Sequence, residues 1–454
     1  MPGFAGKFDC LDSSGAVKHS GAGRFVVDDG RLSIAAPPAA PLMIDLGDVD
    51  FIVDADYRLS IRLFSGASVQ LSQLGRMHDQ LARVLGEQWR QRTIQCLLMS
   101  DLDLLDAFDC TVAGSTADGP FTCPGQIRLY KSNIAVLTEG EPPFMWRLAD
   151  VDQFSVDDNA YAAVIQAGRR RLMVSRLARR TDEFVREFRA AMDELASQAC
   201  AAIGAMLPFL DAHQLQVACS KMREGHSVEL ADLGEIDARI PGHVMALAPA
   251  DQQPYVQHLA SLAMADQTYF GFKLVREIEQ VEESDERGSA GGPPASRPDI
   301  LPGHDTDAEP VPESTPKPAT TTLEGGTAAA SIFRWFFFPI ADANGRPRLV
   351  AWESPDGGGK ATYFFRLEGD CDGVALEQAI THLGRALCNL NFRREPIYLS
   401  DDALKTELRL HHYVVAARRL ADVRFLRSSF AGRAIHTSLE AWKQSVGKVL
   451  SAAL

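Results

Sequence analysis

Pro41-Leu-Met-Ile-Asp-Leu-Gly-Asp-Val-Asp50 returns as Pro143-Phe-Met-Trp-Arg-Leu-Ala-Asp-Val-Asp152, at an offset of 102 residues from Pro41 to Pro143. The match has no gap from Gly23/Gly125 through Asp50/Asp152, and after one inserted residue it resumes at Ser72/Ser175. Phe8-Asp-Cys10 also returns, as Phe108-Asp-Cys110. A period near 100 residues is too long for a solenoid unit, so the pattern indicates two copies of one whole domain.

Each copy predicts about seven short strands followed by one helix. In the first copy, Arg58–Phe64 alternates polar and apolar residues, which is the period of a half-buried strand. The period then changes, because Met77, Leu81, Val84 and Leu85 have helical spacing. We therefore expect a helix from Gln73 to about Arg90. The second copy repeats this order and ends in a helix that carries Phe184 and Phe188 on one face.

This order of elements, with Leu-x-Asp-Val-Asp placed between the hairpin and the later strands, resembles the pleckstrin-homology-like (PH-like) superfamily, including its GRAM-type members. The resemblance covers roughly residues 5–195, twice over. It implies a multidomain α+β protein that begins with two tandem small β-barrels, each capped by a C-terminal helix. The two PH-like domains would occupy residues 1–95 and 96–200.

The resemblance also implies where a ligand would bind. Lipid-binding members use Lys and Arg in the loop between their first two strands. The matching segment of the first copy, Asp12–Gly23, holds only Lys18 and His19, and that of the second, Thr111–Gly125, holds no Lys or Arg. Because a phosphate site needs several convergent cations, this departure favours the protein-binding members of the superfamily.

One basic cluster in the second copy is a candidate contact for an anion or an acidic peptide. It consists of Arg169, Arg170 and Arg171 on an expected hairpin turn and Arg179 and Arg180 near the start of the expected helix. Cations at a helix N-terminus oppose the helix dipole, so helix stability does not explain them. The alternative is an exposed charged hairpin, partly balanced by the acidic residues that begin the helix.

The rest of the chain divides by composition. Residues 201–266 have helical patterns and predict an all-helical connector. Residues 283–330 hold eight prolines and no aromatic residue, which predicts a disordered linker. Residues 267–282 and 331–454 are then one discontinuous α+β domain, in which Thr268–Ile278 pairs with Phe333–Ile340. Helices are expected over Val374–Asn389, over Asp401–Arg424 and from about Phe430 to Leu450.

Three motifs resemble chemical sites, and each fails on a structural requirement. Asp356–Lys360 leads into a strand, whereas a phosphate-binding loop opens a helix. Asp370–Gly373 lacks the carboxylate that a calcium loop needs at its twelfth position. Glu407 and His411 supply two ligands, and a zinc site needs at least three from the protein. We therefore expect no enzyme activity, no metal and no cofactor.

Charge and cysteine usage complete the expectation. The net charge of −14 disfavours global attraction to nucleic acid or anionic lipid, although the segment from Leu404 to the end is basic. No apolar run reaches the roughly 20 residues of a membrane-spanning helix, and no secretory signal is evident. The eight cysteines show no paired spacing, which is typical of reduced thiols in a cytoplasmic protein.

These observations predict a non-enzymatic adaptor or scaffold that binds a protein partner. Two alternatives stay open. One is peripheral binding to an anionic membrane surface or a phosphate ligand through the basic hairpin of the second copy. The other is association with nucleic acid through the basic C-terminal helices, which is the less favoured because aromatic residues are sparse there.

Overall fold

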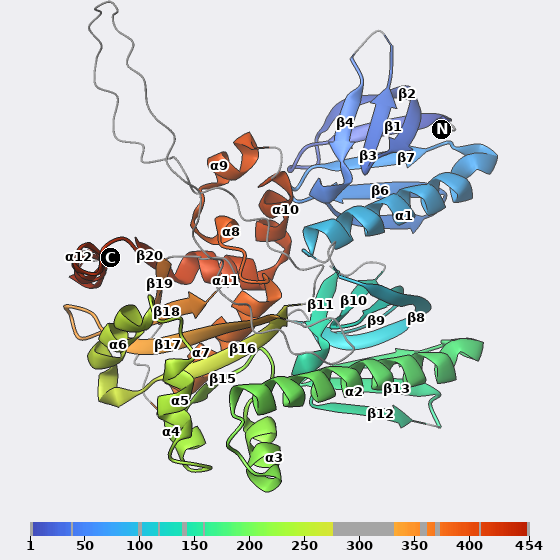
Figure 1. Cartoon of the computed structure of the whole chain (residues 1–454). Helices are drawn as coiled ribbons and strands as arrows, with labels where there is room; N and C mark the ends of the chain where they lie inside the picture. The colour runs from blue at the N-terminus through green and yellow to red at the C-terminus, as the bar shows by residue number, and fades with distance from the viewer. Residues whose placement is uncertain are drawn as a thin grey trace, which may run out of the picture.

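Three antiparallel sheets organise the described part of the chain, and the computed structural model places them side by side (Figure 1). The structure describes residues 3–37, 40–98, 102–116, 119–138, 143–157, 159–275, 331–354, 361–367, 373–407 and 410–451. Two sheets have seven strands each and the third has six. The predicted multidomain α+β class is therefore confirmed.

The first sheet, with its helix α1 (His78–Cys96), is called repeat 1. Its strands are β1 (Phe4–Leu11), β2 (Val17–Asp28), β3 (Arg31–Ala35), β4 (Leu42–Asp45), β5 (Val49–Ala55), β6 (Arg58–Leu63) and β7 (Ser68–Ser72). The strand order in the sheet is β4-β3-β2-β1-β7-β6-β5.

The second sheet, with the first half of helix α2 (Thr181–Met206), is called repeat 2. Its strands are β8 (Leu104–Thr116), β9 (Gly119–Tyr130), β10 (Asn133–Thr138), β11 (Phe144–Arg147), β12 (Gln153–Asp157), β13 (Ala162–Ala167) and β14 (Arg170–Ser175). The order is β11-β10-β9-β8-β14-β13-β12, which is that of repeat 1 shifted by seven strands. The duplication in the sequence is thus a duplication of topology.

The alternating pattern of β6 explains the core of repeat 1. Leu59 and Ile61 are fully buried and pack in one cluster with Leu81 and Leu85 of α1. Burial of each aliphatic side chain contributes roughly 1.5–3 kcal/mol, so the helix is held by its apolar face. In repeat 2 the helix contributes larger side chains: Phe184 and Phe188 fill the corresponding core.

The prediction of closed barrels is wrong. In both repeats the fourth and fifth strands are the two edges of the sheet, and no pairing joins them in the described residues. A short 3-10 turn, Leu46–Asp48 in repeat 1 and Leu148–Asp150 in repeat 2, separates these strands. The turn redirects the chain, so the edges are connected through the backbone but do not share a ladder.

The expected loops Asp12–Gly23 and Thr111–Gly125 are also corrected, because most of each segment is strand. Gly21 and Gly23 lie in β2, where glycine leaves room for the ring of Phe8. A Cβ atom at Gly23 would lie 3.2 Å from Phe8 Cδ1. The glycines of this segment, which suggest a loop in the sequence, allow the backbone of β2 to approach the aromatic ring closely.

The third sheet and the helices around it form what we call the third domain. Its strands are β15 (Ser227–Glu229), β16 (Tyr269–Val275), β17 (Ser331–Ala341), β18 (Pro347–Ser354), β19 (Ala361–Arg366) and β20 (Phe430–Ile435), paired in that order. Its helices are α3 (Ala212–Lys221), α4 (Leu230–Gly234), α5 (Ile240–Ala246), α6 (Gln253–Leu262), α7 (Gly373–Asn389), α8 (Glu395–Tyr398), α9 (Asp401–Thr406), α10 (His411–Arg419), α11 (Ala421–Ser429) and α12 (Leu439–Ser451).

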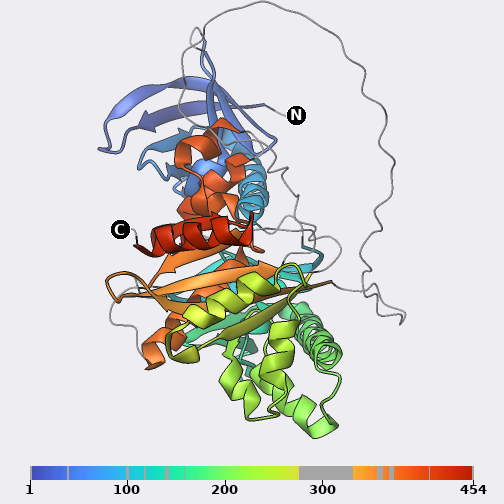
Figure 2. The same cartoon turned by 60° about the vertical axis from the view of Figure 1, so that its left-hand side comes forward.

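Helices cover both faces of this sheet, which explains the long aromatic run in β17. Trp335 and Phe337 pack on one face with α7, α10 and α11, while Phe336 and Phe338 pack on the other with α6 and α12. Successive side chains of a strand point to opposite faces, so a strand buried on both sides has no polar face. Figures 1 and 2 show α8–α11 between this sheet and repeat 1, and Figure 2 shows α12 lying along the strands.

The predicted pairing across residues 283–330 is confirmed. β16 and β17 are antiparallel neighbours, with Tyr269 opposite Phe337 and Val275 opposite Ser331. The all-helical connector is wrong in one element, because β15 lies within it and pairs with β16. The connector helices share the core of the third sheet, so they belong to the third domain.

Two expected helices are also corrected. Asp401–Arg424 is divided among α9, α10 and α11, and Leu420 adopts an extended conformation between the last two so that both can pack on one core. Phe430–Leu450 begins with strand β20, in which Gly432 has a φ of 152° that favours glycine. The expected linker 283–330 and the segments Asp356–Lys360 and Asp370–Asp372 lie outside the described residues.

Gly271 of β16 provides a stability prediction. A Cβ atom there would lie 2.2 Å from Cζ2 of the fully buried Trp335, whose Nε1 donates to Ser227 Oγ at 3.0 Å. We expect Gly271→Ala to lower the free energy of unfolding by about 1–3 kcal/mol through overpacking. Gly242→Ala in α5 is the matched control: no heavy atom lies within 4 Å, so a gain of about 0.5–1 kcal/mol is expected. Equal effects of the two variants in urea unfolding would contradict the packing argument.

Candidate functional site

The repeated Leu-x-Asp-Val-Asp motif forms the contact of each repeat with the third domain. In repeat 2, Arg223 Nη2 donates to the carbonyl oxygens of Ala149 at 2.7 Å and Val151 at 3.3 Å. In repeat 1, Arg419 Nη2 donates to the equivalent carbonyls of Gly47 and Val49. One guanidinium group from the third domain therefore binds the same two backbone oxygens in each copy. We call each of these contacts a corner site.

The first aspartate of the motif, Asp48 in repeat 1 and Asp150 in repeat 2, is also bound in both corner sites, but in different surroundings. Asp48 pairs with Arg418 at 2.9 Å, and both side chains are 43% exposed. The equivalent Asp150 is 3% exposed and pairs with Arg147 of its own repeat at 2.6 Å. Two groups of the third domain complete that site: His226 Nε2 lies 3.0 Å and Arg385 Nε 3.4 Å from Asp150 Oδ1.

The electrostatics of the buried corner follow from these contacts. Burial alone would raise the pKa of Asp150, but the charge of Arg147 and hydrogen bonds from His226 and Arg147 hold it far below its usual range. Burial lowers the pKa of His226, so the ring is neutral near pH 7 and donates its Nε2 proton to the carboxylate. The site is thus an anion held by two guanidinium groups and one neutral imidazole.

Gly225 allows the backbone of the third domain to lie close to Arg147 in the buried corner site. Its φ is 77°, and a Cβ atom there would lie 1.8 Å from Arg147 Nη1. Its carbonyl oxygen accepts a hydrogen bond from Arg147 Nη2 at 3.4 Å. Glycine is required both by the positive φ and by the close approach of the guanidinium group.

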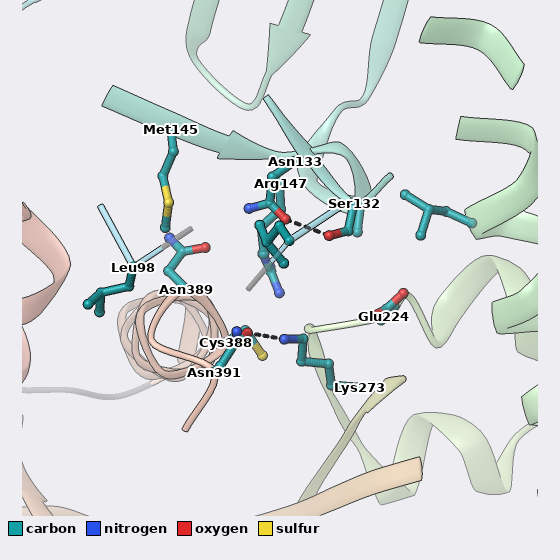
Figure 3. Close-up of a pocket in the computed structure, with 13 residues that line it drawn as sticks. Leu98, Ser132, Asn133, Met145, Arg147, Glu224, Lys273, Cys388, Asn389 and Asn391 are labelled. Carbon is teal, nitrogen blue, oxygen red and sulfur yellow. Dashed lines mark hydrogen bonds between the residues drawn. The ribbon is translucent and has the colours of Figure 1, made fainter. Parts of the chain in front are cut away.

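A small polar cavity lies beside the buried corner, between repeat 2 and the third domain (Figure 3). Figure 3 shows Lys273 directed at Asn391, with Arg147 and Asn133 on the opposite wall. The cavity volume is about 20 Å³, which is room for about one water molecule. Ligand pockets are roughly 300–1,000 Å³, so this cavity belongs to the domain contact and is too small for a substrate.

The structure does not bring the predicted arginine cluster together. Arg169 lies at the β13–β14 turn and Arg170 and Arg171 begin β14, whereas Arg179 and Arg180 lie in a 3-10 turn beyond its other end. A six-residue strand spans roughly 17–20 Å, which separates the two groups. Arg170 lies over the ring of Trp146 at 4.9 Å.

Arg180 has a structural role of its own. Its guanidinium group pairs with Asp106 and with Glu183, donates to Ala107 O at 2.8 Å and lies over the Phe108 ring at 4.3 Å. Asp106, Glu183 and Glu187 bring carboxylate oxygens within 4.8 Å of one another, a spacing that suits a metal ion. Arg180 pairs with two of these three carboxylates, Asp106 and Glu183.

The basic C-terminal helices are mainly engaged inside the molecule. Arg418 and Arg419 bind repeat 1, and Arg427 donates to Pro396 O and Leu399 O and pairs with Asp401. Arg418, Arg424 and Arg427 line an open hollow of about 390 Å³ between α9, α10 and α11. These contacts indicate that much of the positive charge of this segment serves to dock it within the protein.

One arrangement of catalytic type escaped the sequence reasoning. Thr362 Oγ1 lies 2.9 Å from His436 Nε2, and His436 Nδ1 lies 2.9 Å from Gln252 Oε1. The order resembles a nucleophile, a base and an orienting group. Thr362 is fully buried and accepts a further hydrogen bond from Trp442 Nε1 at 3.3 Å, so these residues form a polar network in the core. No spacing in the sequence signals it, because Gln252, Thr362 and His436 are far apart along the chain.

Comparison with models of known protein families found no match, and comparison with curated proteins found none either. Among the described helices, none combines the length and the apolar character needed to cross a membrane. The Glu407–His411 contact considered from the sequence depends on the His411 side chain, which lies outside the description.

Proposed function

We propose that the chain is a non-enzymatic adaptor built on two PH-like repeats, and that it binds a protein partner at the β4 edge of repeat 1. The strand order common to both repeats, followed in each by a C-terminal helix over the core, supports the PH-like assignment. The corner sites fix both repeats to one third domain. A partner that binds one repeat is therefore held in a fixed position relative to the other.

A comparison of equivalent residues carries the proposal. Met43 of β4 is 55% exposed and its neighbour Leu42 is 39% exposed. The equivalent residue of repeat 2, Met145, is partly buried and packs against the core of the third domain beside Leu98. The same position of the same fold is thus covered by protein in one copy and open to solvent in the other.

The β4 edge suits an extended apolar segment of a partner protein. β4 pairs with β3 on one side, and on its other side no strand of the described residues pairs with it. An edge strand offers unpaired backbone donors and acceptors to an added strand. Leu42 and Met43 would supply the apolar contacts that give such binding its strength.

Substitution of Met43 tests this surface. We expect Met43→Asp to weaken retention of the partner at least about tenfold, because a central apolar contact is worth about 2 kcal/mol or more. The measurement is quantitative mass spectrometry of proteins retained from a lysate of the source cells by the immobilised full chain. Val17→Asp is the control, since Val17 is 58% exposed but lies at the start of β2. Equal retention by wild type and Met43→Asp would overturn the proposed surface.

The two alternatives have less support from the geometry. Binding to anionic lipid or phosphate through Arg169, Arg170, Arg171, Arg179 and Arg180 would need these groups to converge, and β14 separates them. Binding to nucleic acid through the C-terminal helices would compete with the contacts that Arg418 and Arg419 make to repeat 1.

A further inference from the structure

Two cysteines that are 19 residues apart in the sequence come into contact in the fold. Cys200 lies in the last third of α2 and Cys219 in α3, and the turn between the helices brings their Sγ atoms to 2.6 Å. Both residues are partly exposed, so a small oxidant can reach them. In contrast, Cys10, Cys96, Cys110 and Cys388 are buried. The expectation of scattered and unrelated thiols therefore does not hold for this pair.

Along the chain, Cys219 lies four residues before Arg223 of the buried corner site. α2 begins in the core of repeat 2 with Phe184 and ends in the core of the third domain with Ile203. α3 leads directly to Arg223, Gly225 and His226, the residues that bind the motif of repeat 2. A covalent bond from α2 to α3 would therefore attach the start of the segment that binds repeat 2 to α2, the helix that contributes to both cores.

We propose that Cys200 and Cys219 form a dithiol site that peroxide converts to a disulfide, which fixes the segment of the third domain that binds repeat 2. One thiol first reacts with hydrogen peroxide to give a sulfenic acid and one water. The sulfur of the second thiol then attacks the sulfenic sulfur, which forms the S–S bond and releases a second water. The two cysteines lose two electrons and two protons, and the peroxide gains them.

Either thiol can begin these steps. Burial, together with the hydrogen bond to Cys200, raises the pKa of Cys219. The thiolate is the nucleophile that attacks peroxide, so the thiol of the pair that loses its proton is oxidised first and the other acts as the resolving thiol. A transient disulfide of this kind is compatible with a reducing compartment, where catalytic and sensing disulfides occur.

Peptide mapping of the full chain tests the site. The reduced protein is treated with hydrogen peroxide, its remaining thiols are alkylated, and the chain is cleaved after Asp and Glu. Cleavage after Glu194, Asp211 and Glu224 places Cys200 and Cys219 on separate peptides, 195–211 and 212–224, each with no other cysteine. We expect these two peptides to be recovered as one species that reduction separates. Recovery of both as alkylated thiols, or joined to other cysteines, would overturn the proposal.

Single variants and hydrogen exchange complete the test. Cys200→Ser and Cys219→Ser should each abolish the linked species, whereas Cys123→Ser should leave it unchanged, because Cys123 is a partly exposed thiol in β9. In the oxidised wild type, amide exchange over residues 212–226 should slow several-fold relative to the reduced protein, and it should not change in Cys200→Ser. A linked species without this slowing would refute the effect on the corner segment.

Discussion

Asp150→Asn is expected to lower the free energy of unfolding by about 3–5 kcal/mol. The substitution keeps the shape of the side chain and removes its charge. Arg147, which is 6% exposed at its side chain, would then be a buried cation without its anion. His226 and Arg385 lose the same partner, so the penalty falls on both sides of the domain contact. Urea unfolding of the full chain measures the change.

The chain contains its own control for this prediction. Asp48 is the equivalent of Asp150 in repeat 1, and its pair with Arg418 is exposed to solvent. Asp48→Asn should therefore cost no more than about 1 kcal/mol, as exposed ion pairs do. The same substitution in the same motif would thus differ several-fold between the two copies. A difference of less than 1 kcal/mol between the variants would contradict the role assigned to burial.

The pH dependence of stability provides an independent check. The pKa of Asp150 is lower in the folded protein than in the unfolded chain, so its charge stabilises the fold above the ordinary pKa near 4. That contribution is lost as the pH falls below about 5, because the unfolded chain binds the proton more readily. The difference between wild type and Asp150→Asn should therefore shrink steadily between pH 5 and pH 2. It should stay constant between pH 7 and pH 8, above the ordinary histidine pKa of about 6.5, where His226 is neutral in the folded and the unfolded chain.

The sequence predicts the duplicated fold because local patterns determine it. Alternation in Arg58–Leu63 and helical spacing from Leu81 to Leu85 depend only on which face meets the core, and the structure has the same faces buried. The open form of both sheets could not be predicted in this way. Whether β4 and β5 pair depends on the direction of the chain after the turn Leu46–Asp48, which no periodicity records.

The corner sites could be predicted only in part. The recurrence of Leu-x-Asp-Val-Asp marks a segment that both copies need, and it draws attention to the correct residues. Its partners, Arg223 and Arg419, lie 72 and 370 positions from the carbonyls of Val151 and Val49 that they bind. Nothing in the local sequence distinguishes them from exposed arginines. The predicted arginine cluster shows the opposite case. Its residues are close in the sequence, but they lie at opposite ends of β14.

The two corner sites also explain why a motif is kept while its surroundings differ. The backbone oxygens of residues 47 and 149 lie in the 3-10 turns, and those of residues 49 and 151 belong to the residues that end these turns, so both copies present them in the same way. An arginine from the third domain can therefore bind either copy in the same manner. The two contacts differ in the ion pair of the first aspartate, which is exposed for Asp48 and buried for Asp150.

Cleavage of the chain between residues 283 and 330 is expected to leave its two parts associated. A site-specific protease sequence inserted there would divide the third sheet between fragments, with β15 and β16 in one and β17–β20 in the other. Seven residue pairs join β16 to β17, and Phe270 and Phe272 share a core with Phe336 and Phe338. Arg418 and Arg419 add the contact of the second fragment with repeat 1. On a sizing column without denaturant, the cleaved protein should elute at the volume of the intact chain.

A variant at the contact between β16 and β17, here called the seam, tests whether the fragments stay together through this contact or by non-specific association. Phe336→Asp places a charge in the apolar core between the two fragments, where its burial is strongly unfavourable. Joining two separate chains costs at least about 4 kcal/mol more than joining parts of one chain, so the cleaved variant should dissociate while the uncleaved variant remains one species. If the cleaved wild type separated in native buffer, the seam between β16 and β17 would not hold one domain together, and residues 331–454 would form an independent unit.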